Sequence, residues 1–342
     1  MASLNGTAPA RYWRSLPDGR LLCELCPRAC RLAEGQRGFC YVRQNLGGRM
    51  QLVSWGRGSG FAVDPVEKKP LFHFLPGSGT FSFGTAGCNL GCRFCQNWHL
   101  SKTHADQRQA DLAAPGEIAA AARRLGCASV SYTYNDPVIF LEFAVETAAA
   151  CRELGLRNVA VTAGYVEEAP RREFFSFMDA ANVDLKAFSE RFYRRHCSAR
   201  LRPVLDTLLH VRHETECWLE ITCLVIPGEN DSDGEIGEMA AWIARELGED
   251  TPLHLSAFHP AWKMADREPT PLSTLLRARD LARDKGLRYV YTGNLRDEEG
   301  GATTCPGCGE TLARRRHFQV LEFHVEEGRC PRCGEAIPGV FA

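Results

Sequence analysis

From Thr80 onward, short apolar runs rich in β-forming residues alternate with longer stretches whose apolar residues recur at helical spacing. The runs predict strands at Thr80–Thr85, Ala128–Tyr134, Asn158–Ala163, Asn182–Lys186, Trp218–Val225, Pro252–Phe258 and Arg288–Tyr291. The stretches between them predict helices at Pro115–Leu125, Val138–Leu154, Glu168–Met178, Val204–His213, Glu235–Leu247 and Leu272–Lys285. Such alternation is typical of βαβ units and a parallel sheet, either doubly wound or rolled toward a barrel.

The two ends of the chain differ from this pattern. Residues 1–50 are rich in Cys, Arg and Gly and show little periodicity, whereas residues 301–342 form a Cys/Gly module with a hairpin-like alternation over Phe318–Val325. The sequence therefore predicts an N-terminal Cys-rich segment over 1–75, an α/β domain over 76–296 and a C-terminal module over 297–342.

A polar motif follows each predicted strand. In order, these are the loop after Thr85, Tyr134–Pro137, Thr162–Tyr165, Asp184–Lys186, Pro227–Asp231, Phe258–Pro260 and Thr292–Asn294. Ligands of parallel α/β folds bind at the carboxyl ends of the strands, so we expect these motifs to converge on one site.

The loop after the first strand carries Cys88, Cys92 and Cys95. Three thiolates at this spacing can hold three irons of a [4Fe–4S] cube and leave one iron open. S-adenosylmethionine, chelated through its amino and carboxylate groups, is the ligand that best fits an open iron. Structural zinc is disfavoured because it takes four ligands. Gly84, Gly87 and Gly91 are expected to give the backbone room to approach the cluster.

Two further cysteine sets have four members each. Cys23, Cys26, Cys30 and Cys40 follow no predicted strand and fit a closed centre, either an accessory iron–sulfur cluster or zinc. Two CPxCG knuckles contain Cys305, Cys308, Cys330 and Cys333 and indicate a ribbon around one tetrahedral ion, with zinc favoured over iron.

Composition and charge limit the possible partners and the location of the protein. The chain has 342 residues, 16 cysteines and a net charge of −1, so global charge favours neither nucleic acid nor a membrane as partner. No apolar stretch approaches the ~20 residues that span a bilayer, and the first residues lack the pattern of a secretion signal. Metal-type cysteine spacing then predicts a reducing, cytoplasmic location.

Other candidate residues are ambiguous by themselves. Asn135 and Asp136 could accept hydrogen bonds from an ammonium group, or form an Asx turn or helix cap. Asp184 and Lys186 share one face of a strand and could pair with each other or with a carboxylate ligand. His259 could bond to a ribose or a carboxylate, although a lone loop histidine is usually incidental.

Several of these motifs resemble those of a known enzyme family. Gly87–Asn97 resembles the signature of radical S-adenosylmethionine (radical SAM) enzymes, and more closely the branch of pyruvate formate-lyase activating enzyme. Other runs resemble the AmmeMemoRadiSam-system radical SAM enzymes: Cys26–Cys30, Asp64–His73, Tyr134–Pro137, Val183–Lys186, Ile226–Asp231 and the CPxCG knuckles.

The resemblance implies a partial (β/α)6-type barrel with a [4Fe–4S] cluster that cleaves S-adenosylmethionine to methionine and a 5′-deoxyadenosyl radical. It places Asn135 and Asp136 near the methionyl amino group, Asp184 and Lys186 near the carboxylate, and His259 near the ribose. The chain has Thr162-Ala-Gly where activating enzymes tend to have Thr-Asn-Gly, so only Thr162 is carried over.

The resemblance also implies an electron donor such as flavodoxin or ferredoxin, and partner proteins of the AmmeMemo system. Two rival hypotheses stand beside this one. The first is a glycyl-radical activase that acts on a partner protein. The second is a zinc-ribbon binding protein with a degenerate barrel, against which the near-neutral charge and the intact cysteine triplet speak.

Overall fold

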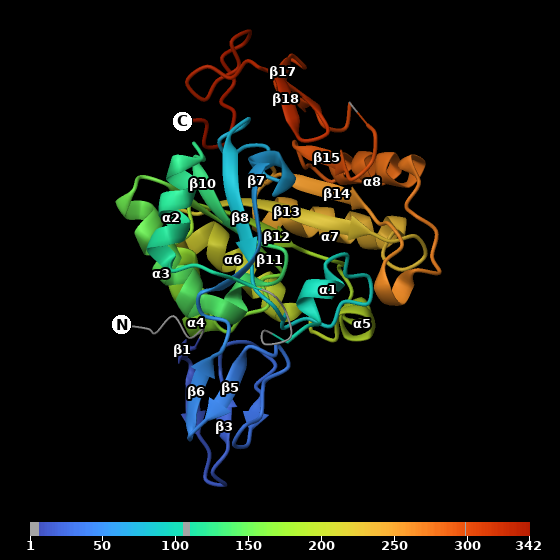
Figure 1. Ribbon diagram of the computed structural model, residues 1–342. Coiled ribbons are helices and arrows are strands. Elements are labelled where there is room, and N and C mark those ends of the chain that lie inside the picture. Colours follow the sequence, from blue (N-terminus) through green and yellow to red (C-terminus); the bar gives the residue numbers. More distant parts are fainter. Residues whose placement is uncertain (1–6, 105–109, 298) are drawn as a thin grey trace.

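Seven parallel strands form the centre of the fold (Figure 1). The computed structural model describes residues 7–104, 110–297 and 299–342. The parallel strands are β8 (Gly79–Gly84), β10 (Ser129–Tyr132), β11 (Arg157–Thr162), β12 (Ala180–Asp184), β13 (Trp218–Val225), β14 (Leu253–Ala257) and β15 (Val290–Gly293). They pair in chain order, with β15 at one edge, so the sheet is an open, partial barrel. The predicted α/β class with a parallel sheet is confirmed.

Helices cross over between these strands. They are α2 (Pro115–Arg124), α3 (Leu141–Glu153), α4 (Glu168–Ser176), α6 (Arg202–Glu214), α7 (Asp233–Glu246) and α8 (Leu272–Asp284). All six predicted helices are present, and their ends differ from the predicted ones by a few residues. The largest difference is at Pro137–Phe140, which forms a separate 3-10 turn before α3.

Alternation along the strands decides which side chains face the helices. On β8, Phe83 packs against Phe143 of α3, with ring centroids 5.7 Å apart. Thr80, which lies on the other face of the strand, bonds to Ser131 of β10 at 2.7 Å between hydroxyl oxygens. The barrel interior is consequently lined in part by small polar side chains.

The segment before β8 extends this sheet and adds a separate β layer. β7 (Arg57–Pro65) pairs antiparallel with β8, and β9 (Asp111–Leu112) pairs with β7. Six short strands precede β7: β1 (Ala8–Pro9), β2 (Trp13–Ser15), β3 (Leu21–Cys23), β4 (Arg31–Leu32), β5 (Arg43–Leu46) and β6 (Arg49–Leu52). They form two three-stranded sheets at one end of the barrel, at the bottom of Figure 1.

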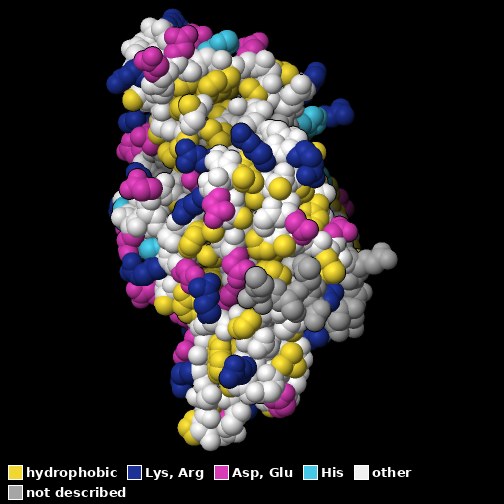
Figure 2. All heavy atoms as spheres, turned by 60° about the vertical axis from the view of Figure 1, so that its left-hand side comes forward, with side chains coloured by type: hydrophobic (Ala, Val, Ile, Leu, Met, Phe, Trp, Pro, Cys, Tyr) yellow, Lys and Arg dark blue, Asp and Glu magenta, His cyan; other side chains and the backbone are white. Residues whose placement is uncertain are grey.

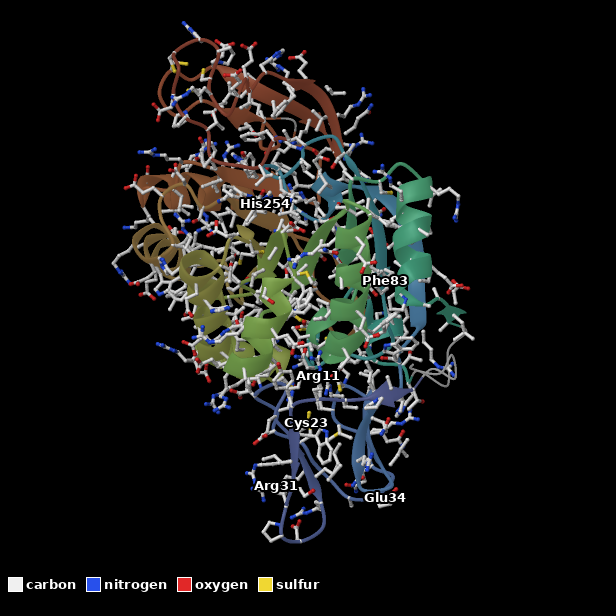
Figure 3. The ribbon with its side chains drawn as sticks, turned by 90° about the vertical axis from the view of Figure 1, so that its left-hand side faces the viewer. Arg11, Cys23, Arg31, Glu34, Phe83 and His254 are labelled. Carbon is white, nitrogen blue, oxygen red and sulfur yellow. The ribbon has the colours of Figure 1, made fainter. Side chains whose placement is uncertain are left out.

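A buried ion pair joins this N-terminal layer to the barrel. The Arg43 guanidinium lies 2.7 Å from the Glu142 carboxylate of α3, and both side chains are buried. Arg43 also donates to the backbone oxygen of Arg11, at 2.9 Å. Figure 3 shows Arg11 at this junction, with Cys23 just beyond it and His254 toward the opposite end.

The C-terminal module lies at that opposite end, near the amino ends of the strands. It contains β16 (Thr303–Thr304) and a hairpin of β17 (Thr311–Arg316) and β18 (Gln319–Phe323). The alternation predicted over Phe318–Val325 corresponds to the second strand of this hairpin alone, because the turn precedes Gln319.

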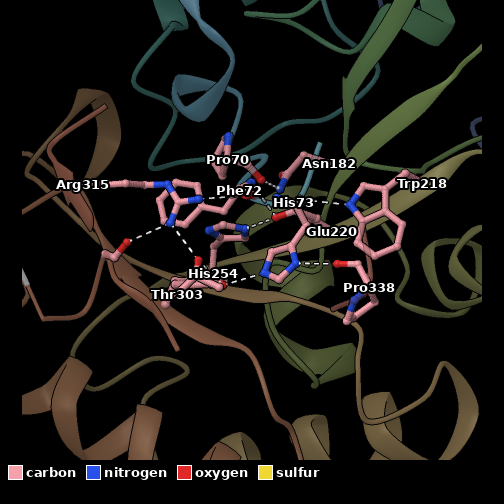
Figure 4. Close-up of polar contacts among 12 residues, drawn as sticks. Pro70, Phe72, His73, Asn182, Trp218, Glu220, His254, Thr303, Arg315 and Pro338 are labelled. Atoms are coloured by element: carbon pink, nitrogen blue, oxygen red, sulfur yellow. Dashed lines mark hydrogen bonds and ion pairs between the residues drawn. The ribbon is translucent and has the colours of Figure 1, made fainter. Parts of the chain in front are cut away.

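A buried polar network fastens the module to the barrel (Figure 4). The Glu220 carboxylate accepts from the amides of Phe72 and His73 and is paired with His254 at 2.6 Å. Arg315 of β17 donates to the Phe72 carbonyl at 2.8 Å. Most polar atoms in this network have a partner, and the Arg315 Nε is an exception among the described residues.

No helix among the described residues is long and apolar enough to cross a membrane. On the face shown in Figure 2, acidic and basic side chains are interspersed over the surface.

Candidate active site at the carboxyl ends of the strands

One pocket lies at the carboxyl ends of the strands, where the polar motifs meet. Its wall contains the thiols of Cys88, Cys92 and Cys95. Asn135, Asp136, Asp184 and Lys186 line the same pocket, from the loops after β10 and β12. Residues separated by almost 100 positions in the chain thus share one cavity, as the strand-end argument predicts.

The cysteine loop is held in place by a helical turn that sequence reasoning missed. Tyr193–Cys197 forms a π-helical turn, a geometry that is frequent at functional sites. The carbonyl of Cys197 accepts from the Gly91 amide at 2.8 Å, and the carbonyl of His196 accepts from the Arg93 amide at 2.8 Å. Two carbonyls in a row therefore set the path of the backbone between Cys88 and Cys95.

Charged and polar neighbours influence the central thiol. A hydrogen bond with Cys197 lowers the pKa of Cys92 below its ordinary value despite burial, and the cations Lys186 and Lys102 act in the same direction. Burial, by contrast, raises the pKa of Cys88 to about 12. Lys102, which follows the loop and donates to the Leu90 carbonyl, supplies positive charge that a bound anionic cluster would require.

The glycines of the loop have a different use from the one predicted. A Cβ built on Gly87 would lie 1.9 Å from the carbonyl oxygen of Cys40, and one on Gly91 would lie 2.7 Å from the Ser198 hydroxyl. At Gly84 the nearest atom would be the Thr133 carbonyl oxygen, at 2.3 Å. These glycines admit neighbouring segments of the protein, so the expectation that they make room for the cluster is corrected.

Asp136 has spare bonding capacity in the site. Its Oδ1 accepts from the Thr162 hydroxyl at 2.8 Å, whereas its buried Oδ2 has no partner among the described residues. Burial raises the pKa of this carboxyl to about 6. An unpartnered carboxylate oxygen on the pocket wall fits an ammonium group, which would supply both hydrogen-bond donors and charge.

Asn135 and Thr162 act on other protein groups. The Asn135 amide nitrogen donates to the Gly87 carbonyl at 2.9 Å, and its oxygen accepts from the Thr85 amide at 3.3 Å. Asn135 thereby ties the β10 loop to the cysteine loop. Thr162 is buried behind Asp136 and orients it, which gives both residues a positioning role in this structure.

Asp184 and Lys186 form an ion pair with 2.8 Å between Nζ and Oδ2. Although burial opposes the charged form, Asp184 and nearby thiols raise the pKa of Lys186 well above its ordinary value. Asn230 of the Pro227–Asp231 motif donates to the Lys186 carbonyl at 2.8 Å, which fixes the backbone beneath the pair. This pair presents a permanent cation to the pocket.

The structure does not bring His259 to the pocket wall. Its side chain is exposed, and its Nε2 lies 2.8 Å from the Asn294 carbonyl oxygen. Ser256 and Thr222, on the neighbouring strands β14 and β13, line the pocket instead. The inward-facing alternation of those strands is the signal that could have found them.

The eight accessory cysteines occupy two separate places. The sulfurs of Cys305, Cys308, Cys330 and Cys333 all lie within 4.8 Å of one another, as ligands of one ion would. Cys23, Cys26 and Cys40 are buried in the N-terminal layer, and Cys30 is half-buried there.

Comparisons with known proteins agree with this geometry. Residues 83–240 match the family described as the radical SAM superfamily. The uncharacterized protein MJ0808 of Methanocaldococcus jannaschii is 41% identical over 330 residues, which cover 96% of this chain and 98% of that protein.

Two solved structures share the fold at low sequence identity. A radical SAM methyltransferase from Sphaerobacter thermophilus is 15% identical, with a TM-score of 0.52 over 85% of this chain and 78% of that one. Streptococcus suis SuiB bound to its precursor peptide SuiA is 14% identical, with a TM-score of 0.51 over 68% of this chain and 52% of that one. The pocket, the cysteine loop and the family match lead to one conclusion: residues 83–240 of this chain form a domain of the radical SAM superfamily.

Proposed function

We propose that this protein is a radical SAM enzyme of the AmmeMemoRadiSam type, with its cofactors in the pocket at the carboxyl ends of the strands. One observation carries the proposal: three thiols, a carboxylate with an unpartnered oxygen and an ion pair line a single cavity. The motif resemblance over nearly the whole chain supports the subfamily.

The residues of the pocket divide the binding of the cofactors between them. Cys88, Cys92 and Cys95 would hold a [4Fe–4S] cluster, and such a cluster supplies the electron that cleaves S-adenosylmethionine to methionine and a 5′-deoxyadenosyl radical. Asp136 would accept hydrogen bonds from the methionyl ammonium group. Lys186, held by Asp184, would face the methionyl carboxylate.

The C-terminal module would hold zinc. Four sulfurs within 4.8 Å of one another suit a single tetrahedral ion, and two CPxCG turns are the usual frame for zinc. The module is fastened to the amino ends of the strands by Arg315, opposite the proposed active site. We therefore assign it a stabilising role.

We also propose a cellular compartment, an electron donor and partner proteins for the enzyme. All 16 cysteines are free thiols, which fits a reducing, cytoplasmic compartment. A low-potential electron donor such as flavodoxin or ferredoxin would reduce the cluster, and AmmeMemo-system proteins would be its partners.

The first test replaces one thiol of the triplet. Anaerobically reconstituted Cys92→Ala should produce 5′-deoxyadenosine only at the background rate, because one iron of the catalytic cluster loses its ligand. Cys127→Ala is the matched control, since Cys127 is another buried thiol and lies outside the pocket wall. We expect the control to retain the wild-type rate, measured by chromatography of the quenched reaction.

Normal turnover by Cys92→Ala would overturn the cluster assignment. Wild-type protein that contains zinc alone after reconstitution would favour the binding-protein alternative. Transfer of deuterium from a backbone glycine of a partner protein into 5′-deoxyadenosine would favour the glycyl-radical activase over the AmmeMemoRadiSam type.

A further inference from the structure

The four N-terminal cysteines form a second thiol site outside the catalytic pocket. Cys23, Cys26 and Cys40 are buried and Cys30 is half-buried, and all four lie in the N-terminal layer. They come from β3 and from the loops that follow β3 and β4. Cys23 and Cys40 belong to the apolar core, and four thiols from one small layer also fit the ligand set of a metal centre.

A backbone group contacts one of these sulfurs. The Phe39 amide donates to the Cys30 sulfur at 3.5 Å. Amide donors to sulfur tune the potential of iron–sulfur clusters.

The backbone beside two of the cysteines is in the left-handed region. Ala29, which precedes Cys30, has φ of 47°, and Tyr41, which follows Cys40, has φ of 67°. Such conformations are unfavourable for residues with a side chain and persist where the surroundings impose them, often at ligand sites. Here they lie directly beside Cys30 and Cys40.

A single ion and a cluster require different arrangements of the sulfurs. Zinc–sulfur bonds of about 2.3 Å place tetrahedral sulfurs about 3.8 Å apart. The sulfurs of the C-terminal set all lie within 4.8 Å of one another, as a single ion requires. An iron–sulfur cube binds each thiolate to a different iron, so its four sulfurs need not meet around one point.

The N-terminal site touches the catalytic loop. The Gly87 backbone packs directly on the Cys40 carbonyl, and Arg28 donates to the Asn89 carbonyl at 2.8 Å. Gly87 and Asn89 flank Cys88, so the two thiol sites are neighbours across a single layer of backbone. The buried Arg43 guanidinium adds a positive charge beside Cys23 and Cys40.

From this arrangement we propose that Cys23, Cys26, Cys30 and Cys40 bind an accessory [4Fe–4S] cluster that serves one-electron transfer. Four thiolates complete the coordination of four irons, so no iron is open to a substrate. A low-potential protein donor would lose one electron, the accessory cluster would gain it and then lose it to the neighbouring catalytic site. The transfer role rests on the proposed function, whereas the presence of the cluster does not.

Iron analysis of variants tests the cluster directly. Anaerobically reconstituted wild-type protein should contain about eight irons and eight sulfides in clusters, and Cys26→Ser and Cys30→Ser should each lose about four of each. Cys217→Ser, at a buried thiol outside all three sets, is the matched control and should lose none. Electron paramagnetic resonance of each variant should still change when S-adenosylmethionine is added.

Two results would overturn the accessory cluster: unchanged iron in both variants, or stoichiometric zinc that is lost from both. Loss of the response to S-adenosylmethionine in the wild-type protein would count against the proposed function alone. For the transfer role, 5′-deoxyadenosine formation driven by reduced ferredoxin should fall further in Cys30→Ser than formation driven by dithionite. Equal rates with ferredoxin in the variant and the wild type would refute that role.

Discussion

At the scale of single residues, Asp136 and Asn135 show how neighbours in sequence take different tasks. Both are polar, both line the pocket, and both come from the same loop. Asn135 uses its amide group in hydrogen bonds to the backbone of Thr85 and Gly87, whereas Oδ2 of Asp136 has no partner among the described residues. The side chain with the free oxygen is the one that we propose to bind a ligand.

Replacing this carboxylate should weaken cofactor binding and spare the cluster. Asp136→Asn keeps an oxygen for the Thr162 hydroxyl and removes the charge that would face an ammonium group. We expect the Kd of S-adenosylmethionine to rise roughly tenfold to 100-fold, because hydrogen bonds to charged groups contribute about 1.5–3 kcal/mol. Isothermal titration calorimetry on the reconstituted protein measures this change.

Iron content is the control for Asp136→Asn and should equal that of the wild type. Thr162→Val should have a smaller effect in the same direction, since it keeps the carboxyl group and removes only the hydrogen bond that orients it. Unchanged affinity in Asp136→Asn would refute the role of this residue in binding the amino group.

At the scale of elements, the cysteine loop is shaped by contacts on both of its sides. The π-helical turn Tyr193–Cys197 accepts from its amides, and Cys40 of the N-terminal layer packs on Gly87. Gly87 has φ of 87°, which is strained for any residue with a Cβ. The loop therefore depends on a glycine for both conformation and space.

Adding one methyl group at this contact should separate the two layers. In Gly87→Ala the new Cβ would meet the Cys40 carbonyl oxygen at 1.9 Å, and the neighbour is backbone that cannot rotate away. We expect destabilisation by about 3 kcal/mol or more, measured by urea unfolding, together with reduced iron content.

Gly116→Ala is a matched control in α2, because no heavy atom lies within 4 Å of a Cβ built there. Alanine at this helical position should stabilise the protein slightly, by less than about 1 kcal/mol. Equal stability of Gly87→Ala and wild type would mean that the loop tolerates a shift of the N-terminal layer.

At the scale of the whole molecule, the two ends of the barrel have different chemistry. The carboxyl ends of the strands carry thiols and a carboxylate with one oxygen that has no partner among the described residues, and the amino ends carry the hydrogen-bonded network around Glu220 (Figure 4). In that network, His73 bonds to the Pro338 carbonyl oxygen at 2.7 Å and to the Tyr291 hydroxyl at 2.6 Å. These contacts suit a neutral imidazole that donates through Nδ1 and accepts through Nε2.

Acid should therefore destabilise the attachment of the C-terminal module. Burial lowers the pKa of His73 from 6.5 to about 4. Between these values the unfolded chain binds the proton and the folded chain does not, so the free energy of unfolding falls as the pH drops from about 6.5 to about 4. The full contribution is about 3 kcal/mol, measured by urea unfolding across this range.

His73→Gln should remove this component of the pH dependence, and His317→Gln, at an exposed histidine, should preserve it. A wild-type slope that persists unchanged in His73→Gln would assign the effect to another group.

Much of the fold and part of the site could be read from local patterns. Strand–helix alternation determined the α/β class, because periodicity of 2 or 3.6 residues is a property of each segment by itself. The strand Trp218–Val225 was predicted to the residue. The spacing of Cys88, Cys92 and Cys95 predicted the chemistry that we propose for the site, since all three thiols lie in one short loop.

Only the tertiary structure decided which groups meet across the chain. Three residues that the sequence did not single out as site residues lie beside the thiols or in the pocket wall: Cys197, Lys102 and Ser256. His259, which was predicted to bind there, instead contacts the Asn294 carbonyl. Position 87 is a further case, because it requires a glycine only where the Cys40 carbonyl of a separate layer packs against it. Spacing in sequence constrains residues within one segment. Contacts between segments depend on how the layers pack, and that packing must satisfy the burial and hydrogen-bonding requirements of all segments together.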